Sequence, residues 1–424
     1  MKYSNKAVLV AAIAAASTQT LANGLALNEQ SASSAGSAYA GRASTALNAS
    51  TLYGNPAGMS RLEQAEVSGG LAFIDASTDI RDAQGAFPGS NEGDMVPFST
   101  VPFGYYVTPL NDKWHAGIGL YAPFGVESDY ERGWQGRYEG LQSMVQVVTI
   151  QPTVSYAFND RVSVGFGPTF NRIDGKLTSN LPNAAFGGSG DAEVKIAGDD
   201  TAVGYNLGLL VSLTDRLDWG VAYHSKMDFT LEGETRVSGA NGMLGPIPPM
   251  SLPGLNGYYD AKLDITMPES VDTSFSYQAT DALALYAGAT WTRWSRLEGI
   301  EVENSGVHPA YAGDFGTITE ELNWEDTWAV AVGGAYQLNP EWVLRAGYAK
   351  DRSPTSDMDR TVRIPVSDRD IVTLGAGWSP TADLTFDAAY AYIDEKKGRV
   401  AQDTYSAEYE NSAHGLALQA TYRF

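Results

Sequence analysis

The residues that could catalyse a reaction are few in this chain and stand far apart. It contains no cysteine, which excludes thiol catalysis and thiolate metal sites. A hydrolase would need a serine, a histidine and an acid within reach of one another. We therefore predict that the protein is not an enzyme and uses neither a cofactor nor a metal. The four histidines are scattered, and none lies in a recognisable nucleophile motif: His115, His224, His308 and His414.

Basic residues could instead hold an acidic ligand. Arg172, Asp174 and Lys176 alternate with Ile173 in one predicted strand, so they share a face. We expect that face to line a polar lumen, where a cation would attract a carboxylate. The same cations could equally pair with acids of that lumen. Arg345 is a third candidate, because the apolar residues on either side of it belong to the opposite face of its strand.

The segment from Val237 to Tyr258 is almost uncharged and unusually apolar for a loop. Such a loop is costly in water unless it folds onto a neighbour or binds something, and methionine adds packing that adapts to varied ligands. We predict that it captures a hydrophobic ligand, with Phe186 in the loop at 179–198 opposite. Packing against other loops as a lid is the alternative. The candidate capture residues are Met243, Leu244, Ile247, Met250, Leu252 and Leu255.

The first 22 residues are typical of a secretory signal peptide. Lys2 and Lys6 precede an apolar run at 7–16, and a stretch of small residues ends at Ala22. We expect Asn23 to be the first mature residue. About ten apolar residues are too few for a membrane-spanning helix, which needs ~20, and no later run is long enough. We therefore expect an exported protein that enters a membrane, if at all, as strands.

The last ten residues alternate as a half-buried strand does. Leu416, Leu418, Ala420, Tyr422 and Phe424 fall on one face, and small, polar or charged residues on the other. This pattern fits a membrane barrel with lipid outside and a polar lumen inside. Taken alone it fits an edge strand of a soluble protein about as well, and the predicted signal peptide favours the barrel.

Composition agrees with an exported barrel. The formal net charge is −22, and removing the signal with its two lysines would make it −24. So negative a charge argues against nucleic acid as a partner, because nucleic acid binding needs a basic surface. The mean hydropathy of −0.21 suits a barrel, in which only alternate strand residues meet lipid.

Short polar turns between alternating apolar segments set the strand count. They recur at 110–112, 158–160, 213–215, 279–281, 338–340 and 380–383 and use Asn, Asp or Pro. With both termini on one side, six tight turns imply about fourteen strands.

We predict an all-β, 14-stranded antiparallel transmembrane β-barrel over residues 62–424. A soluble sandwich or propeller is the alternative, but strands there average ~5–6 residues, shorter than most of these. The expected strands are 62–75, 97–108, 113–122, 142–158, 161–178, 199–214, 217–235, 259–279, 282–303, 317–338, 341–351, 367–379, 382–398 and 408–424.

Residues 23–61 do not alternate and are rich in Ala, Ser and Gly. They could form a loose periplasmic tail. Against this, Asn55-Pro56 is a rigid turn former, and the large side chains of Tyr39 and Met59 would have nothing to pack against in a tail. A barrel of about fourteen strands also has a lumen too wide for its own side chains to fill. We therefore predict that this segment is a small hatch inside the lumen.

Two regions of the sequence resemble the FadL family, the outer-membrane transporters of long-chain fatty acids and hydrocarbons. In the predicted hatch the resemblance lies in residues 28–31, in 36–41 and in Asn55-Pro56-Ala57. Later it lies in Arg345 to Tyr348, in Ser353-Pro354 and in 359–365. It extends over essentially the whole mature chain and implies fourteen strands around a hatch that includes Asn28, Glu29, Asn55, Pro56 and Ala57.

The resemblance also implies passive uptake of hydrophobic substrates and their exit through the barrel wall, at a kink in the third strand. Pro123, Phe124 and Gly125 interrupt that strand, and proline lacks the N–H that a ladder needs. From the residues alone, they could simply mark the end of the strand and the start of an outer loop. The resemblance favours the kink.

The same resemblance indicates a multi-pass protein in the outer membrane of a Gram-negative bacterium, and we expect it to be a monomer. Its expected partners are hydrophobic small molecules (fatty acids, hydrocarbons, or detergent in crystals) and outer-membrane lipid. Where the family's carboxylate-binding basic residues are expected, this chain has Ser179 and Glu325, which keeps neutral hydrocarbons open as substrates. A general porin is a further alternative, although a hatch and an apolar outer loop argue against it.

Overall fold

The computed structural model describes residues 24–245 and 254–424. The predicted signal peptide lies outside the described residues, as do Ile247, Met250 and Leu252 of the predicted capture loop. The strand segments are β1 (Glu66–Gly85), β2 (Ser99–Pro109), β3 (Trp114–Asp129), β4 (Gln142–Asn159), β5 (Val162–Pro182), β6 (Asp191–Thr214), β7 (Leu217–His224), β8 (Met227–Ser238), β9 (Gly257–Met267), β10 (Ser270–Gln278), β11 (Leu283–Thr292), β12 (Gly299–Ser305), β13 (Thr317–Glu321), β14 (Thr327–Asn339), β15 (Trp342–Asp351), β16 (Arg369–Trp378), β17 (Leu384–Glu395), β18 (Gly398–Ala401) and β19 (Tyr405–Arg423). The short helices are α2 (Ala32–Ala35), α3 (Thr51–Gly54), η1 (Pro56–Arg61), η2 (Asn183–Phe186), η3 (Gly242–Leu244), η4 (Trp294–Arg296) and α4 (Ala312–Phe315).

The described strands close into a barrel, because β1 pairs with β2 on one side and with β19 on the other. All pairs of strands are antiparallel. Five strands of the barrel are each divided into two segments: β7 with β8, β9 with β10, β11 with β12, β13 with β14, and β17 with β18. The nineteen segments therefore make fourteen barrel strands, which confirms the predicted 14-stranded barrel.

The interruptions were not expected from the sequence. Pro268 separates β9 from β10 and has no N–H to give the ladder, while η4 separates β11 from β12. The predicted strands 217–235, 259–279, 282–303 and 317–338 each span one of these breaks. The breaks lie at one level of the barrel, since Met227, Met267 and Trp294 beside them belong to one buried cluster.

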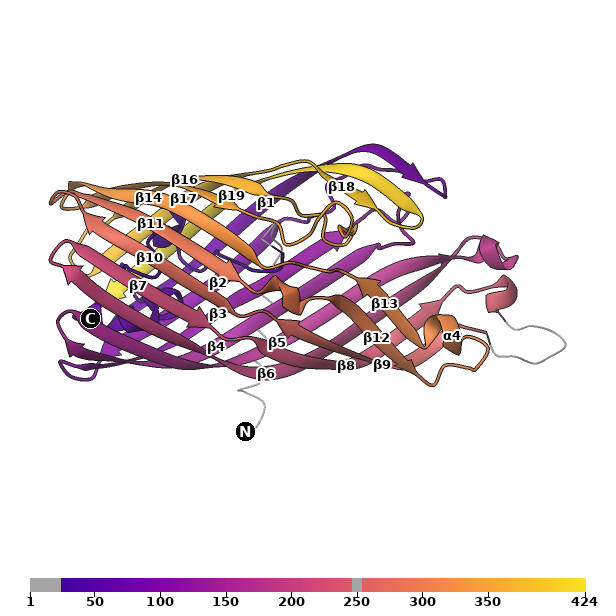
Figure 1. Ribbon diagram of the computed structural model, residues 1–424, viewed down its shortest axis with the longest axis horizontal. Coiled ribbons are helices and arrows are strands. Elements are labelled where there is room, and N and C mark those ends of the chain that lie inside the picture. Colours follow the sequence, from indigo (N-terminus) through magenta and orange to yellow (C-terminus); the bar gives the residue numbers. More distant parts are fainter. Residues whose placement is uncertain (1–23, 246–253) are drawn as a thin grey trace.

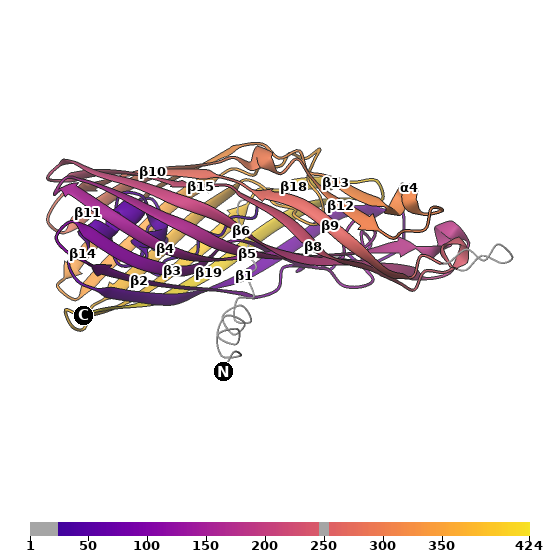
Figure 2. The same cartoon turned by 90° about the horizontal axis from the view of Figure 1, so that it is seen from below.

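Three of the tight turns owe their shape to asparagine. The side-chain oxygens of Asn111, Asn159 and Asn339 each accept hydrogen bonds from two backbone N–H groups just beyond them, at 2.9–3.0 Å. Figure 1 shows these short turns at the end of the barrel where the C-terminus lies and long loops at the other end. Figure 2 shows β8, β9, β12 and α4 at that loop end.

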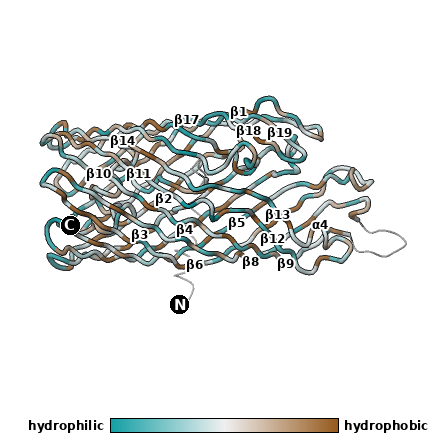
Figure 3. The backbone as a smooth tube through the Cα atoms, in the orientation of Figure 1, coloured by the Kyte–Doolittle hydropathy of each residue, from teal (hydrophilic) through white to brown (hydrophobic). Residues whose placement is uncertain are grey.

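The outer surface of the wall is apolar, as alternation predicts. Hydrophobic and hydrophilic positions alternate along the strands (Figure 3), and Leu416, Leu418 and Tyr422 of the last strand all point outward and are exposed. Aromatic pairs gather at the short-turn end, such as Trp342 against Trp378 with ring centroids 6.0 Å apart. Such a girdle is typical of barrels at a membrane interface. The described residues include no helix long and apolar enough to cross a membrane.

Candidate functional site

Residues 24–61, here called the N-terminal segment, lie inside the barrel near its short-turn end (Figure 1). Their backbone touches wall glycines that face the lumen. A Cβ added to any of seven such glycines would come within 2.7 Å of an atom of the segment, so a larger side chain would force the two apart. We call these residues the glycine collar: Gly165, Gly208, Gly220, Gly288, Gly333, Gly347 and Gly375.

Asn55, Pro56 and Ala57 anchor the segment to one side of the wall. The amide nitrogen Nδ2 of Asn55 donates to the carbonyl oxygens of Ala43 at 2.6 Å and of Leu209, in β6, at 3.0 Å. Its Oδ1 accepts from the N–H of Ala57 at 3.0 Å and so caps η1, in which Pro56 is the first residue. The Asn-Pro pair is therefore both a helix start and a bond to the wall.

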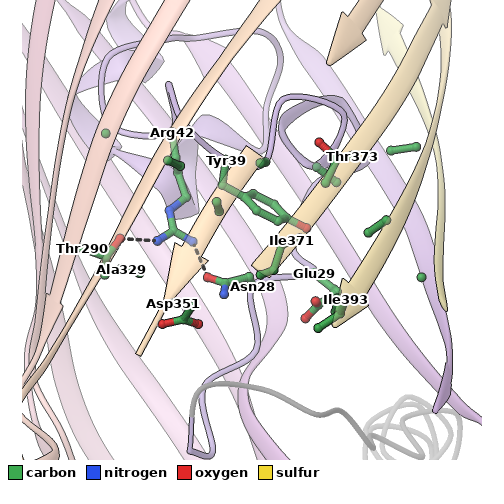
Figure 4. A pocket seen from close by; sticks show the side chains of 18 of the residues that line it. Asn28, Glu29, Tyr39, Arg42, Thr290, Ala329, Asp351, Ile371, Thr373 and Ile393 are labelled. Carbon is green, nitrogen blue, oxygen red and sulfur yellow. Dashed lines mark hydrogen bonds between the residues drawn. The ribbon is translucent and has the colours of Figure 1, made fainter. Parts of the chain in front are cut away.

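Arg42 attaches the other side of the segment to the wall, a role that no motif in the sequence indicates. Its Nη1 donates to Oδ1 of Asn28 at 2.9 Å, and its Nη2 donates to Thr290 at 3.3 Å. Arg42 also forms a buried ion pair with Asp272, a residue of β10. Figure 4 shows Arg42 between Thr290 and Asn28.

Glu29 is buried beside this group. Burial raises the pKa of its carboxyl above the usual value, while Arg369 and Arg42 act in the opposite direction. Its Oε2 has no hydrogen-bond partner among the residues that the structure describes. Glu29 lines a cavity of about 1050 Å³, together with Ile371 and Ile393. We call this the β17 cavity, because Ile393 and Ala389 of β17 form part of its wall.

A second cavity of about 790 Å³, the β3 cavity, lies beside the third strand. Tyr121, Pro123 and Phe124 line it, as do polar residues such as Asn171 and Asn206. It shares Ala26, Asn28, Arg42 and Asp272 with the β17 cavity, so the two adjoin at Arg42.

The third strand does not stop at residue 122, as the interpretation from the residues alone would have it; β3 continues to Asp129. Its ladder with β2 ends at the pair Gly104–Leu120, and residues 99–103 of β2 pair with β1 but not with β3. On the other side, the register with β4 shifts between Tyr121 and Phe124.

The shift is that of a β-bulge with one extra residue, because Tyr121 opposes Thr149 whereas Phe124 opposes Val147. The N-terminal segment covers part of the unpaired edge: the N–H of Leu27 donates to the Pro123 carbonyl at 2.9 Å, and that of Gly125 to the Leu25 carbonyl at 2.8 Å.

On the outer face, a hollow extends over β1 to β6 at the same place. Exposed apolar side chains line it, among them Tyr106, Ile118, Leu120 and Phe170. Tyr105, whose hydroxyl donates to the carbonyl of Gln30 inside the lumen at 3.0 Å, also lines this hollow. The wall is therefore thin between the hollow and the lumen.

A further cavity of about 520 Å³, the extracellular slot, lies toward the loop end. Its lining comes from the inner faces of β4, β5, β6, β8, β9 and β12, and is almost wholly apolar. Gly175, Gly198 and Gly233 leave room in it. The larger apolar side chains are Val145, Ile173, Leu177, Ile196, Leu231, Leu263, Ile265, Ile300 and Val302.

The predicted capture residues that the structure describes lie elsewhere, at the loop tips. Leu244 and Leu255 are buried in a cluster with Val194 and Phe315, and Phe186 packs at its edge. Met243 is 61% exposed. The segment at 179–198 is thus the neighbour of the apolar loop. The described leucines, Leu244 and Leu255, are buried against neighbouring segments and are not exposed to a ligand.

The prediction that Arg172 faces the lumen is wrong, whereas Lys176 is among the residues that line the extracellular slot. Alternation puts Arg172 on the side of Phe170, which is 52% exposed, while Ile173 is fully buried inside. Above the membrane the interior is the apolar slot, so the usual assignment of polar residues to the lumen is reversed. Arg172 instead pairs on the outer face with Asp174 at 3.1 Å and with Asp199 at 3.0 Å.

Arg345 does point inward, where it pairs with Asp387 at 2.7 Å. Other buried arginines of the described chain are paired in the same way, Arg369 with Asp351 at 2.7 Å and Arg363 with Glu320 at 2.8 Å. The lumen therefore contains many charged side chains, but these are largely paired with opposite charges.

Comparison with known proteins identifies similar chains over nearly the full length. The family model described as "Outer membrane protein transport protein (OMPP1/FadL/TodX)" matches residues 13–424. Outer membrane protein P1 of Haemophilus influenzae is 28% identical over 94% of this chain and 91% of its own length. A long-chain fatty acid transport protein of Escherichia coli is 25% identical over 97% of this chain and 96% of its own.

Solved structures agree. A FadL homologue of Pseudomonas aeruginosa superposes with a TM-score of 0.85 at 26% identity, over 95% of this chain and all of that one. The toluene transporter TodX of Pseudomonas putida has a TM-score of 0.71 at 19% identity, over 95% of this chain and 100% of that one. At that identity the likeness concerns the fold alone.

Proposed function

Because this chain belongs to the OMPP1/FadL/TodX family of outer-membrane transport proteins, we propose that it carries hydrophobic small molecules into Gram-negative cells by passive diffusion. The substrates are long-chain fatty acids or related lipids, or else neutral hydrocarbons; relatives are named for fatty acid and for toluene transport. The family is one of transporters, so the protein is not an enzyme.

The extracellular slot is the first binding site in this proposal. Polar sugars cover the outer membrane, so a hydrophobic molecule needs an apolar surface before it reaches the lipid. The slot offers one above the membrane with hardly any polar lining. Loop-tip residues such as Leu244 and Leu255 support its walls, since they are buried against neighbouring loops.

Residues at the start of the N-terminal segment close the path between the slot and the lumen. Leu25 is buried against Phe124 and Trp294, and the rings of Phe124 and Trp294 lie 6.3 Å apart. Leu231 and Ile265 of the slot belong to the same cluster. A substrate that leaves the slot therefore meets Leu25 first, and displacement of residues 24–27 opens the β3 cavity.

The N-terminal segment acts as the hatch. It is fastened at Asn55 and Arg42 and fits against the glycine collar, so it blocks the aqueous route to the periplasm. The substrate then leaves sideways, through the wall beside Pro123, Phe124 and Gly125, into outer-membrane lipid. One barrel contains every part of this path, and the protein works as a monomer.

The observation that carries the proposal is the break in pairing between β2 and β3. It stands between the β3 cavity inside and the apolar hollow outside. Backbone groups left unpaired at membrane depth are tolerated only where they line a cavity or passage.

Removing the extra residue of the bulge tests this exit. Deletion of Pro123 restores the register of β3 with β4, and should abolish uptake of a radiolabelled fatty acid while binding at the cell surface persists. Pro123→Ala keeps the extra residue and is the matched control, with uptake retained. Normal uptake by the deletion variant would argue for release downward past the hatch.

A further inference from the structure

Arg42 stands where three of the cavities in the described chain meet. It lines the β17 cavity, the β3 cavity and a third cavity of about 320 Å³ within the N-terminal segment. We call the third one the segment cavity. Its lining is largely polar and includes Gln30, Ser31, Ser34, Ser50 and Thr51. Arg42 therefore stands between the two cavities of the barrel lumen and the small polar cavity within the segment.

The Nε–H of Arg42 lacks an acceptor among the described residues. Its two terminal nitrogens donate to Asn28, Thr290 and Asp272, but the buried Nε has no partner among the described residues. A buried donor without an acceptor is costly. The guanidinium lies 5.8 Å from the ring centre of Tyr39 and 6.0 Å from that of Tyr53, and both tyrosines also line the segment cavity.

Arg345 provides a comparison. It too is buried, is paired with an aspartate and has an Nε without a partner among the described residues. It is not among the residues that line any of the three cavities around Arg42. Arg42 thus combines a spare donor with space for a ligand, whereas Arg345 has the donor alone.

The surrounding acids decide on which side an anion would sit. Glu29 and Asp351 line the β17 cavity, and Asp351 also lines the β3 cavity (Figure 4). The described residues of the segment cavity include no carboxylate, only hydroxyls, amides and the two tyrosines beside Arg42. A carboxylate is repelled least on that side.

We propose that Arg42 forms a head-group subsite for amphiphilic substrates with a terminal carboxylate, which accepts the Nε–H while the alkyl chain lies in the apolar lumen. The subsite rests on the proposed transport function and selects among its substrates. An alkane or an ester cannot replace the charge-assisted bond and leaves the donor unpaired or more weakly paired.

Equilibrium binding to the full mature protein in lipid nanodiscs tests the subsite, with dodecanoate and its methyl ester as probes. The acid should bind about tenfold more tightly than the ester, as one hydrogen bond to a charged group implies. The paired change Arg42→Gln with Asp272→Asn leaves no buried orphan charge and should abolish that preference while the ester still binds. The matched control, Arg345→Gln with Asp387→Asn, should keep the preference.

Arg42→Lys serves as a second variant should the paired change loosen the segment, as judged by protease resistance of residues 24–61. It keeps the charge beside Asp272 but lacks the Nε, and should also lose the preference. Equal binding of acid and ester by the wild type, or an unchanged preference in either Arg42 variant, would overturn the subsite and leave transport intact. Failure of both probes to bind would instead contradict the proposed function itself.

Discussion

At the scale of single residues, the contacts that hold the N-terminal segment in the lumen are those that matter most for function. Arg42 and Asp272 could not be predicted as partners, because they are 230 positions apart and each stands alone in an unremarkable stretch. Asn55 could be predicted as a turn former from its proline neighbour, but not as a ligand of the wall carbonyl of Leu209. Local chemistry is visible in a sequence, whereas long-range pairing is not.

Glu29 should make the attachment of the segment depend on pH. Its pKa is raised by burial, so the folded state holds a proton that the exposed carboxyl releases. The corresponding stability is present at low pH and is lost as the pH rises through the raised value. Hydrogen exchange of residues 24–61 should therefore speed up with rising pH, beyond its intrinsic dependence. Glu29→Gln should flatten that trend, whereas Glu63→Gln, at an exposed position, should not.

Asn55→Ala should loosen the segment without unfolding the barrel. It removes two donated hydrogen bonds and the cap of η1, which together stabilise by about 1–3 kcal/mol. We expect faster proteolysis of residues 24–61 and slower uptake, with normal assembly in the membrane. Asn111→Ala, in a tight turn away from the segment, is the control. A segment as protease-resistant as that of the wild type would count against the anchoring role.

At the scale of elements, strand number and turn positions followed from alternation and turn residues, because both are local. Which side chains of β5 face the lumen could not be predicted in this way. Arg172 was assigned to the lumen on the rule that polar residues face inward, and that rule holds only at membrane depth. The extracellular slot was missed for the same reason, since Ile173 and Leu177 look like lipid-facing residues in the sequence.

Filling the slot should weaken capture. A Cβ on Gly175 would lie 2.9 Å from Cδ2 of Leu231, so Gly175→Val should crowd the cavity. We expect lower affinity for fatty acid at the cell surface and little change in the yield of folded barrel. Met243→Ser, at the exposed loop tip, is expected to change binding hardly at all. If Met243→Ser lowered the affinity more than Gly175→Val did, the capture site would lie at the loop tips instead.

At the scale of the whole molecule, the N-terminal segment inside the closed wall argues against an open pore. Planar bilayers with the intact protein should show no large, steady ion current, because the segment lies inside the barrel and packs closely against its wall. A porin with its lumen open would conduct continuously. Sustained conductance at the level of a general porin would therefore reject the hatch. Asn111→Ala serves here as the control for Asn55→Ala, the variant that is expected to loosen the segment.

The glycine collar also has a consequence for the order of assembly. The segment meets glycines of the wall on strands from β5 to β16, mostly through its own backbone atoms. A coil with so little clearance cannot slide into a barrel that has already closed. The sheet must instead curl around residues 36–57 while its last strands are still free, and β19 then seals against β1. Residues 36–57 therefore act as the template around which the barrel is assembled.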